Sequence, residues 1–213
     1  MKRSKVFLAT MLLAGLVAGG AHAASLDVNG TAALVGSFGL EVQFAGDTQV
    51  AYVQDDTPAN ETVYRASFQM DPTNLNLGAN DRFTVLFGRD QDQSTGTLRL
   101  EMRRNATNRM RLMGAVKKND GTFSVTNNPV KWLVVGNQPI GIMVEAVFEF
   151  GASGGGSIKV TRLDTNGSTM NDGINNGNFN LDLVRFGAPR DVDAGTTGSL
   201  YLDEFESFRT LAP

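Results

Sequence analysis

The sequence lacks cysteine and contains a single histidine, His22. Without cysteine the chain can form no disulfide, no thiolate-bound zinc or iron–sulfur site, and no thiol nucleophile. Beyond the first 23 residues it also lacks any apolar run near the roughly 20 residues that a membrane-spanning helix needs. A large hydrophobic core must therefore hold the fold together.

The first 23 residues have the three parts of a secretory signal peptide. A basic start is followed by the apolar run Val6–Val17, and Ala21-His22-Ala23 places small residues before a cleavage site. We predict a mature chain that begins near Ala24 and is exported to the periplasm or the extracellular space. An uncleaved N-terminal anchor helix is the alternative.

Removal of this segment narrows the chemistry that the mature protein can perform. It leaves 190 residues, shifts the formal net charge from −3 to −6, and takes away the only histidine. No Ser-His-Asp or Cys-His triad and no histidine-based metal site can then be built. Acid–base chemistry is left to Asp, Glu, Lys and Tyr. The negative charge argues against sequence-independent binding of nucleic acids.

Two-residue alternation of apolar and polar residues dominates the mature chain and predicts about a dozen strands. Thr62–Met70 and Ile142–Phe150 are clear examples, and Asn119-Asp120-Gly121 predicts a hairpin turn. The 21 Gly and 17 Asn of the mature chain mark many further turns. We predict an all-β fold, an antiparallel β-sandwich or jelly roll, as a single domain over residues 24–213. Thr165–Asn180, which is rich in Asn and Gly, is expected to be a surface loop.

The last strand carries a resemblance to a known family. Thr197-Gly198-Ser199-Leu200-Tyr201-Leu202-Asp203-Glu204-Phe205, together with Phe186-Gly187-Ala188 and Tyr64-Arg65-Ala66-Ser67-Phe68, resembles bacterial concanavalin A-like lectin/glucanase jelly rolls, including laminin G-like modules. The resemblance implies a concanavalin A-like sandwich, and it supports the fold more than an activity.

The resemblance also implies a structural calcium site, because that family can hold Ca²⁺ with one Asp and backbone carbonyls. Asp203 is the corresponding residue. Asp164-Thr165-Asn166-Gly167 and Asn171-Asp172-Gly173 offer further oxygen ligands, although these segments also suit Asx turns that hold no metal.

Carboxylate pairs are the main candidates for catalysis, because glycoside cleavage needs only two carboxyl groups. The resembled glucanases use Glu-x-Asp-x-Glu, whereas here Val147 lies between Glu145 and Glu149 in place of the Asp. Residues four apart in a strand are separated by about 13–14 Å, and retaining cleavage needs carboxyls about 5–5.5 Å apart. In Asp203-Glu204-Phe205-Glu206 the three acids do not share a face.

Two further functions remain open. A polysaccharide lyase would have Tyr52, Tyr64 or Tyr201 as its base and arginine to neutralise a uronate. A binding module would use the outward-facing charged side chains, which we expect to line one sheet face and bind a glycan if their strands are neighbours. These predicted ligand-binding residues are Arg65, Arg99, Glu101, Arg103, Glu145 and Glu149. A solvated face with cross-strand Arg–Glu pairs is the alternative.

Trp132 could offer a sugar-stacking platform, but its apolar surroundings favour a core position. The sequence therefore favours an exported, non-catalytic β-sandwich that binds a carbohydrate or another cell-surface partner. The alternatives are a polysaccharide hydrolase or lyase that uses carboxylates or tyrosine, and a structural surface or matrix protein.

Overall fold

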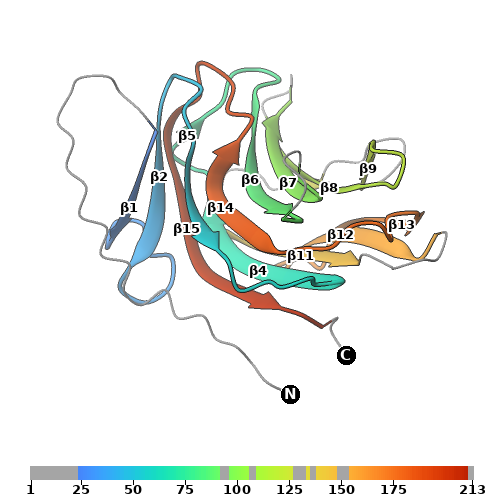
Figure 1. The fold of residues 1–213 in the computed structure, drawn as a ribbon. Coiled ribbons are helices and arrows are strands. Elements are labelled where there is room, and N and C mark those ends of the chain that lie inside the picture. Colours follow the sequence, from blue (N-terminus) through green and yellow to red (C-terminus); the bar gives the residue numbers. More distant parts are fainter. Residues whose placement is uncertain are drawn as a thin grey trace.

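A computed structural model describes residues 24–91, 96–105, 109–126, 133–134, 138–147 and 154–210. These residues form two antiparallel sheets that pack face to face, and they contain no helix of the length and hydropathy needed to cross a membrane (Figure 1). The predicted all-β jelly-roll sandwich is thus confirmed. The signal peptide, Trp132 and Glu149 lie outside the described residues.

Sheet A runs in the order β1 (Ser25–Asn29), β2 (Gly39–Ala45), β15 (Thr197–Phe208), β4 (Val63–Asp71), β11 (Ile140–Val147), β12 (Gly156–Arg162) and β13 (Ser168–Ile174), with β5 (Leu75–Asn76) beside β15. Sheet B runs in the order β10 (Leu133–Val134), β8 (Met110–Lys117), β7 (Leu98–Arg104), β6 (Arg82–Arg89), β14 (Leu183–Arg190) and β3 (Ala51–Asp55), with β9 (Phe123–Val125) beside β8. Both sheets curve strongly, and sheet B lies inside the curve of sheet A (Figure 1).

The core lies between the sheets and follows from the alternation in each strand. In β4, Tyr64, Ala66, Phe68 and Met70 point inward and are buried, while the residues between them are partly exposed. Across the sandwich, β7 contributes Leu98, Leu100 and Met102 to the same cluster. Phe68 meets Phe186 of sheet B edge-on, with 4.8 Å between ring centroids. Burial of this apolar surface is the main force that holds the sheets together.

Two local predictions have different outcomes. The hairpin at Asn119-Asp120-Gly121 is confirmed, because β8 pairs with β9 and Gly121 has a φ of 82°. The predicted surface loop over Thr165–Asn180 is wrong, because it contains the edge strand β13, which pairs with β12. An edge strand gains its backbone hydrogen bonds from one neighbour and needs few apolar side chains, so its composition resembles that of a loop.

Candidate functional site

The outer face of sheet B brings charged side chains from several strands into cross-strand rows. The pairing registers place Arg111, Arg103 and Arg82 side by side on β8, β7 and β6. A second row holds Met113, Glu101 and Thr84, and a third holds Arg99, Phe87 and Arg185. Because neighbouring strands lie about 4.8 Å apart, members of one row are in reach of one another.

This outer face is recessed rather than freely solvated. Glu101 points away from the core, yet its side chain is only 2% exposed. Phe87, Met113 and Ala115 on the same face are also buried, although none of them belongs to the hydrophobic core between the sheets. Sheet B lies on the inner side of the curved sandwich, so its outer face is concave (Figure 1). A concave, partly apolar surface with converging polar groups is typical of ligand sites.

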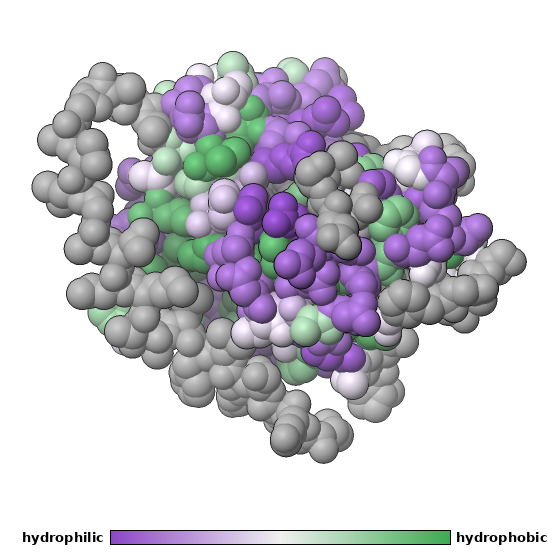
Figure 2. All heavy atoms as spheres, viewed as in Figure 1, coloured by the Kyte–Doolittle hydropathy of each residue, from purple (hydrophilic) through white to green (hydrophobic). Residues whose placement is uncertain are grey.

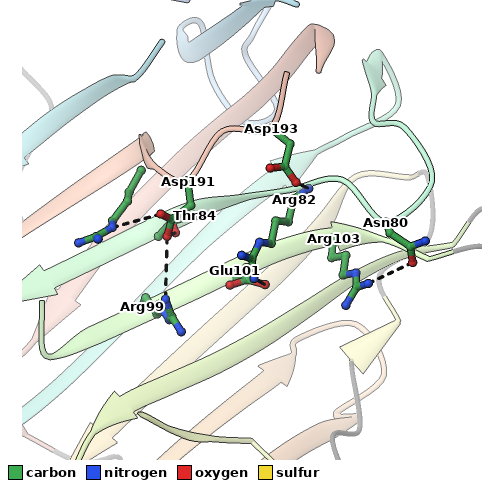
Figure 3. A network of polar contacts seen from close by, with 9 residues as sticks. Asn80, Arg82, Thr84, Arg99, Glu101, Arg103, Asp191 and Asp193 are labelled. Carbon is green, nitrogen blue, oxygen red and sulfur yellow. Dashed lines mark hydrogen bonds and ion pairs between the residues drawn. The ribbon is translucent and has the colours of Figure 1, made fainter. Parts of the chain in front are cut away.

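The polar contacts in this recess hold the arginines in place (Figure 3). Arg82 Nη1 lies 3.5 Å from Glu101 Oε1, and Arg103 Nη2 donates a 3.0 Å hydrogen bond to Asn80. Asp191 follows β14 and lies 3.9 Å from Arg99 Nη1. Guanidinium groups held in this way lose less side-chain entropy when they bind a carboxylate.

Several polar atoms in the recess are buried and have no partner among the described residues. They include Glu101 Oε2, Arg99 Nε and Arg111 Nε. A buried donor or acceptor without a partner costs about 1–3 kcal/mol, and like charges directly opposite each other in a sheet are also destabilising. In the row of Arg82, Arg103 and Arg111, like charges face one another, so this row carries the second cost. An anionic ligand would offset the second cost.

Hydrophobic contacts flank the arginines. The Arg99 guanidinium lies 4.2 Å from the centroid of the Phe123 ring, and that of Arg185 lies 4.5 Å from the ring of Tyr52. Arg185 Nε also donates a 2.7 Å hydrogen bond to Gln54. Cation–π contacts leave the guanidinium edge available for hydrogen bonds.

Two side chains near this face carry an amine or a phenol group. Lys117 is at the end of β8, is largely buried, and has its Nζ 5.1 Å from the centroid of the Phe179 ring. Tyr52 is on β3 at the edge of the sheet. The other two tyrosines lie elsewhere: Tyr201 is on sheet A, and Tyr64 is in the core, where burial raises its pKa far above the ordinary value.

The structure separates the predicted ligand-binding residues into two groups. Arg99, Glu101 and Arg103 lie together on sheet B, whereas Arg65 and Glu145 are cross-strand neighbours on the outer face of sheet A. Glu145 lies 3.8 Å from Lys159 Nζ, and the Arg65 guanidinium packs 4.4 Å from the centroid of the Phe208 ring. The two groups face opposite sides of the sandwich, so they cannot form one surface.

Sequence reasoning missed Arg82, Arg111, Arg185 and Asp191 as members of the site. The first three lie at outward positions of strands that the alternation pattern had located. The alternation of apolar and polar residues in these strands could have placed the three arginines on an outer face. Their convergence with Arg99 depends on strand order, which alternation does not encode.

The surroundings of Asp203 do not fit a cation. Its Oδ2 accepts hydrogen bonds from the backbone N–H groups of Leu34 (2.9 Å) and Val35 (2.8 Å), and its Oδ1 accepts one from Glu204. Backbone N–H groups present positive charge where calcium would need oxygen ligands. Within the part of the chain that the structure describes, no three acidic or histidine side chains gather as a metal site would require. Asp203 instead anchors the loop between β1 and β2.

The sequence matches no protein-family model and no curated protein. Solved structures share the fold. The cellulose-induced protein Cip1 is similar with a TM-score of 0.58 and 13% identity, over 89% of this chain and 87% of that one. An alginate lyase, Aly36B, solved with alginate trisaccharide, has a TM-score of 0.55 and 11% identity over 81% and 82%. An endo-β-1,4-glucuronan lyase from the fungus Trichoderma reesei has a TM-score of 0.54 and 10% identity over 88% and 87%. At these identities the likeness shows a jelly-roll β-sandwich and no activity.

Proposed function

We propose that this protein is an exported lyase of acidic polysaccharides whose site is the outer face of sheet B. The observation that carries the proposal is the recessed arginine cluster around Glu101, which is built from β6, β7 and β8. Two of the similar structures are lyases of alginate and glucuronan, which supports the choice of lyase over non-catalytic binding.

The binding step follows from charge and geometry. The chain carries a formal net charge of −3, yet this face concentrates arginines. Guanidinium groups bind carboxylates through two parallel hydrogen bonds, and the recess strengthens those bonds by excluding water. Glu101 is buried beneath these arginines and holds Arg82 through a contact of 3.5 Å, so its role would be to position the arginines.

The chemical step needs an electrostatic group and a base. Arg99, at the centre of the face, would hold the uronate carboxylate and stabilise the negative charge that develops when the adjacent carbon loses its proton. Lys117 or Tyr52 would take that proton. The released electron pair forms the C4=C5 double bond, the C4–O bond to the leaving sugar breaks, and the leaving oxygen takes up a proton from the protonated base or from water.

Non-catalytic recognition of the same polysaccharide is the second candidate, and it uses the same arginines. The sequence favoured this function because no catalytic spacing of carboxylates was found. Binding without turnover would leave a lectin-like role of the kind that the concanavalin A-like resemblance implies.

The test is an assay of the mature protein on a panel of polyuronates, with neutral glucans as the comparison. Cleavage is followed by the ultraviolet absorbance of the unsaturated product, and binding by isothermal titration calorimetry. We expect turnover on a polyuronate and a loss of about 10²–10³-fold in Arg99→Gln. Tyr52→Phe and Lys117→Met identify the base, because each removes one proton acceptor and retains most of the side chain.

Arg65→Gln is the matched control, because Arg65 also packs on a phenylalanine ring but lies on the other sheet. It should retain full binding and activity. If no polyuronate is bound, or if Arg65→Gln is impaired as strongly as Arg99→Gln, the proposed site is wrong. Binding without any product would select the non-catalytic candidate.

A further inference from the structure

A second groove lies on the outer face of sheet A, on the opposite side of the sandwich from the arginine cluster. It has a volume of about 320 Å³, near the lower end of the range for small-molecule sites. Its lining comes from the β1–β2 loop, β4, the start of β11 and the turn after β12: Leu34, Val35, Gln69, Pro139, Ile140, Gly141, Leu163 and Asp164.

The floor of the groove is a cross-strand row. Asp203 on β15 pairs with Gln69 on β4, and Gln69 pairs with Gly141 on β11. Gly141 keeps the floor open, because a Cβ there would lie 3.0 Å from Leu163 Cβ and 3.1 Å from Gln69 Nε2.

One wall is fixed by Asp203. The bulge in β15 between Asp203 and Glu206 gives Glu204 a φ of 52°, and the Asp203 carboxylate accepts the backbone N–H groups of Leu34 and Val35. These bonds hold the β1–β2 loop over the sheet. Val35 is 49% exposed, so the loop presents an apolar edge to the groove.

The opposite wall is also apolar and carries little free charge. Leu163 is 39% exposed, and its backbone N–H is bonded to Gly141. Asp164 is engaged by Arg162 through two hydrogen bonds of 3.0 and 2.6 Å, so the pair presents no net charge. An anionic ligand would find no free cation here, unlike on sheet B.

The polar group that remains is the side-chain amide of Gln69, which has no hydrogen-bond partner among the described residues. An amide offers two donors and an acceptor, the set that vicinal sugar hydroxyls match. Apolar walls suit the CH faces of a sugar ring. We propose that this groove binds one residue of a neutral glycan, separately from the acidic polysaccharide at sheet B.

The test uses the mature protein with ¹⁵N labelling and a panel of neutral hexasaccharides: cello-, laminari-, manno- and xylohexaose. We expect chemical-shift changes at the Gln69 side-chain amide and at the backbone amides of Gly141 and Leu163 with at least one of them. Gln69→Ala should weaken that binding at least tenfold, and Gly141→Ala should abolish it by filling the floor.

Gln43→Ala is the matched control, because Gln43 lies on the same face, on β2, outside the groove. It should bind as the wild type does. The inference does not rest on the proposed lyase, since Gln69→Ala should leave polyuronate binding and cleavage unchanged. It is overturned if no neutral hexasaccharide shifts the groove resonances, or if the shifts map to the outer face of sheet B.

Discussion

The outer faces of the two sheets carry similar residues in different surroundings. On each face an arginine packs on a phenylalanine ring, Arg99 on Phe123 and Arg65 on Phe208. On sheet A the charges alternate across strands, and the Glu145 side chain is 14% exposed. On sheet B arginines oppose arginines, and Glu101 is only 2% exposed. The two faces therefore differ in the burial of the central acid and in the clustering of like charges, more than in their residue types.

Electrostatics explains why these two arrangements have different uses. Opposite charges that face each other across strands on an exposed surface neutralise one another and contribute little. On sheet B five arginines outnumber the two acids Glu101 and Asp191, and an excess of one sign on a concave face keeps a local potential. Sheet B is therefore the face that can attract an anionic polymer, even though the whole chain is acidic.

The largest difference between the two faces is expected when the central acid of each is removed. Glu101→Ala should lower the free energy of unfolding by about 1–2 kcal/mol, because it leaves the arginines that face one another across β6, β7 and β8 without the acid among them. Glu145→Ala should cost less than about 1 kcal/mol, because the Glu145 side chain is itself more exposed than that of Glu101, at 14% against 2%. Urea denaturation of both variants measures the two values. Equal losses would mean that the two faces do not differ in effective burial.

A smaller effect is expected from salt, which should weaken binding at one proposed site more than at the other. Raising the ionic strength from 0.05 to 0.5 M should weaken polyuronate binding about tenfold or more, because mobile ions screen the arginines and compete with them. Neutral hexasaccharide binding at the sheet A groove should stay within about twofold. Titration calorimetry at both salt concentrations gives the ratio, and a salt-independent polyuronate affinity would contradict binding through the arginines.

Strand alternation in the sequence was enough to predict the all-β sandwich, the hairpin at Asn119-Asp120-Gly121 and the outward positions of Arg99, Glu101 and Arg103. A period of two tells which side chains share a face of their own strand. It carries no information on which sheet a strand joins, so Arg65 and Arg99 looked equivalent.

The sequence also does not show which outward-facing residues on sheet B are buried. Alternation treats a polar outward residue as exposed, whereas Glu101 is buried because the sheet is concave. The aligned rows of arginines depend on registers that bulges in β6 and β14 alter. Figure 2 shows hydrophilic residues over the top, centre and right of one face and hydrophobic residues more to its left, a distribution that a linear sequence does not display.

The Asp203 anchor should have a moderate effect on stability. Asp203→Ala removes the acceptor for two loop amides and should cost about 1–2 kcal/mol. Hydrogen exchange at Leu34 and Val35 should accelerate, while Asp203→Asn, which keeps one side-chain oxygen, should retain part of the protection. A melting temperature that falls with chelator in the wild type, but not in Asp203→Ala, would restore the calcium prediction.

The smallest expected effect concerns the ion pair on the wall of the sheet A groove. Hydrogen bonds from Arg162 hold the pKa of Asp164 below its ordinary value. Because this carboxyl is more acidic in the folded chain, its contribution to stability is full above the ordinary pKa of about 4 and is lost as the pH falls through the lowered value. Asp164→Asn should therefore flatten the acid side of the stability–pH profile slightly.

Asp172→Asn is the control, since Asp172 is exposed on the neighbouring strand β13. Urea midpoints measured from pH 6 down to pH 3 test this, and identical acid slopes in the wild type and Asp164→Asn would show that the Arg162 contact is not maintained in solution.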